Sequence, residues 1–197
     1  MTLINGLLII PDFITLEEEI EFATSIDEQE WYGNGKPLHN INHQLKRRFQ
    51  MYGHLFCFKD RIVKKRLDGM PSSIHHMMQK IKQFEPQMTN NMDSIMINEY
   101  LDNQGIMPHI DASVFGNNIL IVSLLSDVVL QLSKLGNIHY TTLPRRSLFI
   151  LSGESRYLYK HAILKDKVSI FMDNGPNTWH VVEREPRRIA IILREIV

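Results

Sequence analysis

Residues 98–111 read Asn-Glu-Tyr-Leu-Asp-Asn-Gln-Gly-Ile-Met-Pro-His-Ile-Asp, and the rest of the chain is organised around this stretch. It begins inside a predicted strand, residues 94–101, which is rich in apolar and aromatic side chains. Residues 102–105 have the composition of a loop. An extended segment follows and carries His109 and Asp111. Residues i and i+2 of a strand share a face, about 6–7 Å apart, so this imidazole and carboxylate can converge on one ion.

A His-x-Asp pair alone is a weak signal, because a solvated surface loop contains the same residues. A second histidine would complete the two-histidine, one-carboxylate arrangement that leaves positions open on non-haem Fe(II). His161, fifty residues after Asp111, is the preferred third ligand because a jelly roll brings strands so far apart in sequence side by side. His180, in a predicted loop, and His139, in a predicted strand, remain alternatives.

Composition limits the class of protein. A chain of 197 residues that is 44% hydrophobic can bury one substantial core, so we expect one domain over residues 1–197. The 22 basic and 22 acidic residues cancel, and any nucleic-acid contact would need a local patch. A single cysteine excludes an intrachain disulfide and fits a reducing compartment. Without a basic leader or a membrane-length apolar run, we expect a monomeric cytoplasmic or nuclear protein with no membrane contact.

The pattern of elements predicts an α+β fold. Residues 6–10 form a predicted strand, and Thr15 with Glu18 makes a capping box for a helix from Leu16 to about Ile26. A second helix is predicted from Pro71 to Phe84. Short predicted strands then follow at 94–101, 107–112, 119–124, 127–133, 137–141, 147–151, 159–163, 168–172 and 187–194. This order indicates a jelly roll with helices packed on one face.

We divide the chain into an N-terminal extension, residues 1–91, and a jelly-roll core, residues 92–197. Residues 31–58 are polar and irregular and form a predicted hairpin-like substrate lid. Basic residues interleaved with aromatic ones suit phosphate contact and base stacking, although a hairpin with a solvated basic edge is an equal alternative. The candidate contacts are Lys46, Arg47 and Arg48 for phosphates, with Lys64 and Arg66 nearby, and Phe49 and Tyr52 for stacking.

The last predicted strand carries Arg188 and Arg194 on one face, among apolar residues. Buried arginines need anions, and a guanidinium matches a carboxylate in a bidentate way. A small dicarboxylic acid that also chelates iron would satisfy both arginines. The alternative is that the two side chains reach solvent from opposite ends of the strand.

Taken in order, Asn98-x-Tyr100, His109-x-Asp111, His161 and Arg188-x5-Arg194 resemble the signature of the AlkB family of Fe(II)- and 2-oxoglutarate-dependent dioxygenases. The resemblance covers most of the chain. It implies a double-stranded β-helix in which His109, Asp111 and His161 hold Fe(II). It also implies that O2 is consumed and that 2-oxoglutarate is held by Asn98, Tyr100, Arg188 and Arg194. The chain departs from the family at Ala190, where a polar residue is usual.

Residues 109–115, 143–148 and 153–157 are similar to the branch that hydroxylates modified wobble uridines of tRNA. Vertebrate members of that branch also carry RNA-binding and methyltransferase domains, for which these 197 residues have no room, and this counts against the tRNA assignment. A separate RNA-binding or methyltransferase subunit is an open alternative. An oxidative demethylase of N-methylated DNA or RNA bases is the nearest alternative. An oxygenase of a protein or small molecule, and a non-enzymatic β-sandwich binding module, are the more distant ones.

Overall fold

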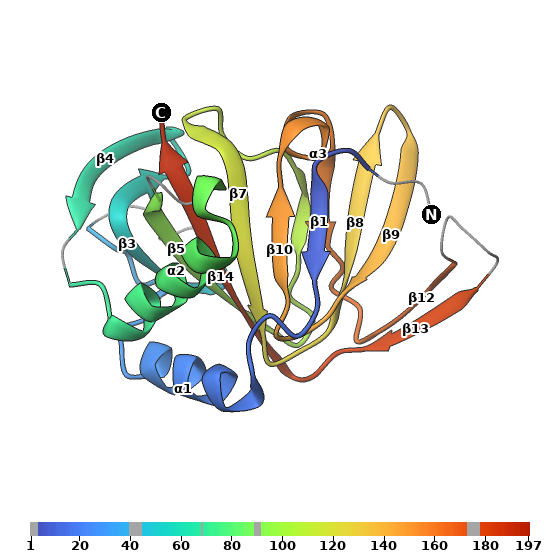
Figure 1. The fold of residues 1–197 in the computed structure, drawn as a ribbon, viewed down its shortest axis with the longest axis horizontal. Helices are drawn as coiled ribbons and strands as arrows, with labels where there is room; N and C mark the ends of the chain where they lie inside the picture. The colour runs from blue at the N-terminus through green and yellow to red at the C-terminus, as the bar shows by residue number, and fades with distance from the viewer. Residues whose placement is uncertain (1–3, 40–44, 68, 89–91, 173–177) are drawn as a thin grey trace.

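The computed structural model describes residues 4–39, 45–67, 69–88, 92–172 and 178–197. Most of its strands form two antiparallel sheets (Figure 1). The larger sheet contains β1 (Leu7–Ile10), β2 (Tyr32–Gly33), β3 (Arg48–Cys57), β4 (Ile62–Leu67), β5 (Met92–Leu101), β7 (Phe115–Leu124), β10 (Leu148–Leu151) and β14 (Arg187–Ile196). Its strand order is β1-β10-β7-β14-β5-β3-β2, with β4 paired to β3.

The smaller sheet has the order β6-β11-β8-β9, and a separate ribbon pairs two further strands. The bounds are β6 (Ile106–His109), β8 (Val128–Lys134), β9 (Asn137–Leu143), β11 (Lys160–Ile163), β12 (Val168–Met172) and β13 (Trp179–Glu183). Side chains from both sheets meet in one apolar cluster, which includes Ile121 and Phe149 of the larger sheet and Leu130 and Ile163 of the smaller one. Two antiparallel sheets packed face to face confirm the predicted jelly roll.

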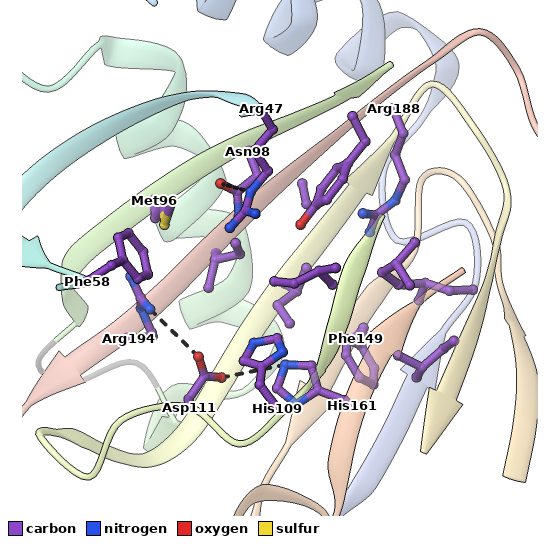
Figure 2. A pocket seen from close by; sticks show the side chains of 18 residues that line it. Arg47, Phe58, Met96, Asn98, His109, Asp111, Phe149, His161, Arg188 and Arg194 are labelled. Atoms are coloured by element: carbon purple, nitrogen blue, oxygen red, sulfur yellow. Dashed lines mark hydrogen bonds and ion pairs between the residues drawn. The ribbon is translucent and has the colours of Figure 1, made fainter. Parts of the chain in front are cut away.

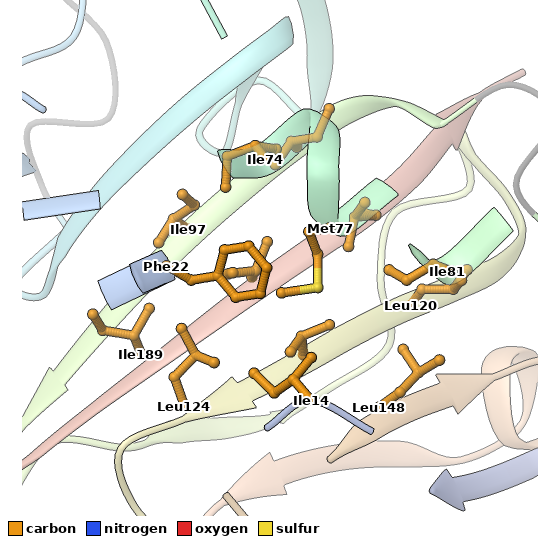
Figure 3. Packing of buried hydrophobic residues seen from close by; sticks show 14 of the residues in the cluster. Ile14, Phe22, Ile74, Met77, Ile81, Ile97, Leu120, Leu124, Leu148 and Ile189 are labelled. Carbon is orange, nitrogen blue, oxygen red and sulfur yellow. The ribbon is translucent and has the colours of Figure 1, made fainter. Parts of the chain in front are cut away.

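Helices α1 (Leu16–Asp27) and α2 (Ser72–Phe84) cover the outer face of the larger sheet (Figures 1 and 3). The other helical segments are the short α3 (Gly153–Tyr157), which follows β10, and a 3-10 turn at Pro86–Met88. Phe22 of α1 and Met77 of α2 pack with Ile97, Leu124 and Ile189 of the sheet. This packing explains why both helical patterns in the sequence carry one apolar stripe. None of the described helices is long and apolar enough to cross a membrane.

The predicted capping box at the start of α1 is confirmed. The Thr15 hydroxyl accepts from the Glu18 amide at 3.2 Å, and the Glu18 carboxylate accepts from the Thr15 amide at 2.8 Å. These bonds satisfy two amides that the first turn of a helix leaves without partners.

The predicted lid is different from what the structure has. Residues 48–57 form β3, which lies inside the larger sheet between β5 and β4, and residues 40–44 fall outside the described residues. Phe49 is fully buried and Tyr52 is 8% exposed, each packed in a core cluster. The prediction that these two rings stack on a base is therefore wrong, because both faces of β3 are already covered.

Strand β3 was not predicted from the sequence because it contains polar residues and a glycine. Gln50 is buried, but its amide donates to the Ile26 carbonyl at 2.8 Å and accepts from the Tyr52 hydroxyl at 2.9 Å. Gly53 has φ +68, and a Cβ there would lie 2.0 Å from the Asp93 carbonyl oxygen. The glutamine is tolerated in the core because its hydrogen bonds are satisfied, and the glycine is required because two backbone segments approach closely. In the sequence alone, both residue types are more typical of a loop than of a buried strand.

Candidate active site

The His-x-Asp motif and His161 meet on the smaller sheet. His109 is the last residue of β6, and Asp111 lies two residues beyond it. Strand β11 runs antiparallel to β6 and places His161 directly opposite His109. One ligand atom from each of the three side chains lies within 4.8 Å of the others. The structure thus assembles the three residues that the sequence selects for iron (Figure 2).

The nitrogens of this triad are available for a metal. His161 Nε2 is 3.8 Å from Asp111 Oδ2, and the two imidazole centroids are 4.2 Å apart. His109 Nδ1 is 2.8 Å from the Met107 carbonyl oxygen, an acceptor that fixes a proton on this nitrogen. Such a bond orients the ring and leaves Nε2 free to coordinate.

The two alternative histidines lie elsewhere. His180 is on the ribbon strand β13, with its ring stacked on Phe171 at 5.2 Å. His139 is on β9, with its ring 6.2 Å from that of Tyr159. Neither belongs to the triad, the one group of three such ligands found among the described residues.

Burial sets the charges of the triad. Burial lowers the pKa of His161 to about 4, so its imidazole is neutral near pH 7. Burial also opposes ionisation of Asp111, but His161, in its protonated form at low pH, and the cationic Arg194 outweigh it and leave the pKa of Asp111 below its usual value. Neutral imidazole and ionised carboxylate are the forms that bind a metal ion.

The opposite wall of the same pocket belongs to the larger sheet. Asn98 and Tyr100 lie on β5, and Arg188 and Arg194 lie on β14. Tyr100 is the register partner of Arg188. All four residues are buried and line one pocket together with the triad. We call these four residues the arginine wall.

The two arginines of this wall have few partners of opposite charge. Arg188 Nε donates to Ser123 Oγ at 3.1 Å. Arg194 Nη1 is 3.9 Å from Asp111 Oδ1, and the guanidinium lies 3.7 Å from the centre of the Phe115 ring. Arg194 Nε has no hydrogen-bond partner in the described part of the chain. Burial lowers the pKa of both arginines to about 10. Buried cations that are so poorly paired fit an anionic ligand.

Ala190, the departure from the family pattern, lies within this wall. It is the register partner of Asn98 on one side and of Ser123 on the other. The Ser123 hydroxyl meets the Arg188 guanidinium, so a neighbouring strand supplies a polar contact that position 190 lacks. Sequence reasoning missed Ser123 because it sits in the apolar pattern of β7, where nothing marks it.

The predicted position of Arg47 on an exposed lid differs from the position that the structure shows. The sequence places it among phosphate contacts on a lid, but its side chain lines the pocket. Its Nε donates to Asn98 Oδ1 at 3.1 Å, and its guanidinium lies 5.7 Å from the centre of the Tyr100 ring. Arg47 therefore adds a third cation to the arginine wall, as Figure 2 shows. The residue just before β3 faces inward because the strand's alternation continues back to it.

Lys46 and Arg48, the neighbours of Arg47, are exposed. Arg48 makes two hydrogen bonds to the buried Glu99 carboxylate, at 2.5 and 2.6 Å, and its guanidinium lies 5.1 Å from the Trp31 ring centre. Lys64 is exposed and pairs with Asp60 at 3.4 Å. The structure does not describe the Arg66 side chain. These contacts leave Lys46 as the cation of the basic run with no partner among the described residues.

The segment 143–148, which resembles the wobble-uridine branch, contributes two ion pairs that stabilise the fold. Arg145 pairs with Glu19, a fully buried carboxylate of α1. Arg146 pairs with Asp12 at 2.6 Å. Both arginines thus tie the loop before β10 to the N-terminal segment, which gives their presence a reason independent of substrate.

A scan against protein families matches residues 6–194 to the model described as 2OG-Fe(II) oxygenase superfamily. The chain belongs to that superfamily. It is an AlkB-type domain and a 2-oxoglutarate-dependent dioxygenase, for which Fe(II), 2-oxoglutarate and O2 are required. The side chains of the pocket fit this requirement. The triad offers two imidazoles and a carboxylate to a metal ion, and the arginines of the opposite wall can bind an anion.

Named relatives place the chain among AlkB homologues. It is 31% identical to the Arabidopsis thaliana "Alkylated DNA repair protein ALKBH8 homolog", over 98% of this chain and 59% of that protein. It is 33% identical to the Xenopus tropicalis "tRNA (carboxymethyluridine(34)-5-O)-methyltransferase alkbh8", over 84% of this chain and 26% of that protein. A Caenorhabditis elegans "DNA N6-methyl adenine demethylase" is 26% identical over 98% of this chain and 60% of its own length. The chain thus spans 60% or less of these relatives.

Among solved structures, OsALKBH1 superposes with a TM-score of 0.66 at 13% identity, covering 99% of both chains. At this identity the likeness supports the fold alone. It agrees with the two-sheet architecture and the outer helices described above.

Proposed function

We propose that His109, Asp111 and His161 hold the Fe(II) ion and that Asn98, Tyr100, Arg188 and Arg194 hold 2-oxoglutarate. The observation that carries this proposal is the placement of the triad opposite buried, poorly paired arginines in one pocket. A ligand with two carboxylates, one of which chelates a metal, matches both walls at once. Mn(II) or Co(II) should bind in place of iron.

Each residue then has a stated task. Iron with 2-oxoglutarate and O2 supplies the oxidising power for a C–H bond, and the chain supplies position and exclusion of water. The triad would hold the ion and leave coordination positions open for other ligands. Arg188 would pair with the distal carboxylate of 2-oxoglutarate, and Arg194, whose Nη1 is 3.9 Å from Asp111 Oδ1, would serve the end that chelates the metal. The apolar side chains of Ile121, Leu130 and Phe149 also line the pocket and would disfavour water beside the bound ligands.

We further propose that the substrate is nucleic acid, and that it is a modified wobble uridine of tRNA, hydroxylated on its side chain. The similarity to two ALKBH8-type proteins, one named for carboxymethyluridine 34 of tRNA, supports this choice. A tRNA loop also presents bases that are already unstacked, so no duplex has to be opened.

Mass spectrometry of tRNA nucleosides tests the substrate. tRNA incubated with the protein, Fe(II), 2-oxoglutarate and O2 should yield a modified uridine that is heavier by one oxygen atom. Omission of 2-oxoglutarate is the control. Unchanged uridines together with succinate production in the presence of another polymer would refute the tRNA assignment while leaving the oxygenase intact.

An oxidative demethylase is the second candidate, supported by the Caenorhabditis elegans relative. Hydroxylation of an N-methyl group gives a product that releases formaldehyde, whereas hydroxylation of a carbon side chain does not. Formaldehyde release from N-methylated DNA or RNA, with no hydroxylated uridine from tRNA, would favour this reading.

The basic residues around β3 have to be tested one at a time, because the structure separates them. Lys46→Ala should weaken tRNA binding and reduce the slope of its salt dependence by about one, as expected for one lost phosphate contact. Arg47→Ala should instead raise the requirement for 2-oxoglutarate or substrate, since its side chain lies in the pocket. Identical effects of the two changes would show that Arg47 leaves the pocket to contact phosphate.

A further inference from the structure

Arg156 is the largest buried side chain outside the two pocket walls whose purpose the chemistry above leaves unexplained. It lies on α3 and is 2% exposed. Its guanidinium makes four hydrogen bonds, all to backbone carbonyl oxygens of one short segment. The acceptors are Asp111 at 3.2 Å, Ala112 at 2.9 Å, Phe115 at 3.1 Å and Gly116 at 3.4 Å.

The segment that accepts these bonds is the one that carries Asp111. Residues 110–114 connect β6 to β7 outside the strand ladders; Asp111 and Ala112 belong to this loop, whereas Phe115 and Gly116 are the first residues of β7. The Ala112 carbonyl also accepts from the Phe115 amide at 3.1 Å, so Arg156 adds to the bonds that the loop makes with its own backbone. The planar fork of an arginine can serve several carbonyls at once, which a lysine ammonium on its thinner stem cannot. Arg156 therefore ties the loop that carries Asp111 to the first residues of β7 through a single side chain.

This arrangement is costly for the fold by itself. Among the described residues, Arg156 has no carboxylate within ion-pair distance; its guanidinium donates to neutral carbonyls and lies 4.9 Å from the centre of the Tyr157 ring. A buried cation without a counter-charge lowers stability, and an apolar side chain of similar volume is often better tolerated. A cation placed there has to be explained by what it fixes.

The same stretch of chain also supplies His161. Residues 153–163 run from α3 directly into β11, so Arg156 and His161 are five positions apart on one continuous element pair. The start of this stretch is itself anchored, since the Ser152 amide donates to the Gly6 carbonyl at 2.9 Å and the Tyr157 hydroxyl donates to Asn117 Oδ1 at 2.6 Å. One anchored segment thus provides a metal-facing histidine and grips the loop of the metal-facing carboxylate.

We infer that Arg156 is a positioning residue for the metal centre: it fixes the backbone of Asp111 relative to His161 so that the two ligands keep their spacing before any ion binds. This inference rests on the proposed metal site. Residues that orient metal ligands are worth roughly 10- to 100-fold in metal affinity when changed. Arg156 touches neither metal nor cosubstrate in this account.

The chain offers a matched control in Arg184. It is also buried and donates its Nη1 to two backbone carbonyls, those of Gln104 and Leu164, each at 2.9 Å. Arg156→Met and Arg184→Met therefore remove the same kind of side chain from the same kind of environment. Arg156→Lys is a third variant, which keeps the charge and most of the volume and loses the fork.

Two measurements test the inference. The first is titration of metal-free protein with Co(II), followed by visible absorption, in the absence of any substrate. The second is amide hydrogen exchange of residues 111–117 in metal-free protein. We expect Arg156→Met to weaken Co(II) binding by roughly 10- to 100-fold and to speed exchange in this segment. Arg184→Met should match wild type in both, and Arg156→Lys should fall between.

The outcomes separate the two proposals. If wild type binds Co(II) and Arg156→Lys equals it in both affinity and exchange, the positioning role is wrong. The role is also wrong if Arg184→Met loses as much affinity as Arg156→Met, because the loss would then follow general destabilisation. If wild type itself binds no Co(II), or still binds it after His161→Ala, the proposed metal site fails first.

Discussion

The two walls of the pocket are built on different principles. The triad wall, on the smaller sheet, places two imidazoles beside one carboxylate. One hydrogen bond orients His109, and four from Arg156 hold the segment from Asp111 to Gly116. The arginine wall, on the larger sheet, buries Arg188 and Arg194 against the rings of Tyr100 and Phe115, with one hydroxyl and one carboxylate 3.9 Å away as polar partners. The first wall is held in place in advance. The second is electrostatically incomplete, and we expect its ligand to complete it.

The largest effect should come from the triad wall. His161→Ala removes a proposed ligand and should reduce turnover of 2-oxoglutarate below detection and abolish Co(II) binding, with the fold retained by circular dichroism. His180→Ala, on the ribbon, is the control and should behave as wild type. The reverse pattern would show that His180 is the ligand.

On the arginine wall, Arg188→Ala should raise the 2-oxoglutarate concentration needed for half-maximal turnover by roughly 10- to 100-fold, the cost of a lost charge-assisted pair. Arg188→Lys should recover part of this, since a point charge does not reproduce the fork. The neighbouring Arg187, which faces outward and pairs with Asp27 and Glu99, provides the control. Arg187→Ala with an equal effect would contradict the proposed role.

Acid should destabilise the metal-free protein through the triad. Folding lowers the pKa of His161 to about 4, mainly by burial, from an ordinary value near 6.5. Between these values the unfolded chain binds more protons, so the free energy of unfolding should fall as pH drops from about 6.5 towards 4, by up to roughly 3 kcal/mol. His161→Gln should remove this part of the pH dependence in urea unfolding. An unchanged slope in that variant would mean that His161 titrates normally.

The smallest expected effect, a change in the stability of the ligand-free protein, tests directly whether the arginine wall is electrostatically incomplete. Because Arg188 is a buried and poorly paired cation, Arg188→Met should raise the stability of the ligand-free protein, by about 1 kcal/mol. Arg187→Met should lower it, since two carboxylates lose a partner. Urea midpoints of both variants decide the matter. A clear loss of stability in Arg188→Met would mean that the arginine wall is already complete without an anion.

These contrasts also explain what the sequence could and could not predict. Short-range patterns predicted α1, α2 and most strands of the jelly roll, because caps and apolar spacing are local. The residues of both walls were selected from ordered motifs, and the structure brings them into one pocket. The failures lie where a residue's role depends on distant partners. The sequence predicts that Phe49 and Tyr52 stack on a base, since the strand that buries them contains a glutamine and a glycine and does not resemble a buried strand.

Arginines were the hardest residues to interpret from sequence. Arg47 and Arg48 are adjacent, yet one lines the pocket and the other pairs with Glu99 on the opposite face. Arg156 enters the sequence analysis only as part of the 153–157 stretch, and only the fold reveals the four carbonyls around it. The charge of a side chain therefore does not predict whether it lies on the buried or the exposed face of a strand.

A crystal structure with Mn(II) and 2-oxoglutarate, located by anomalous scattering, tests the division of labour between the walls most directly. The account predicts one manganese peak coordinated by His109, Asp111 and His161, and a 2-oxoglutarate molecule that chelates it and reaches Arg188 with its distal carboxylate. A manganese ion held by other side chains, or a distal carboxylate bound away from Arg188, would contradict it.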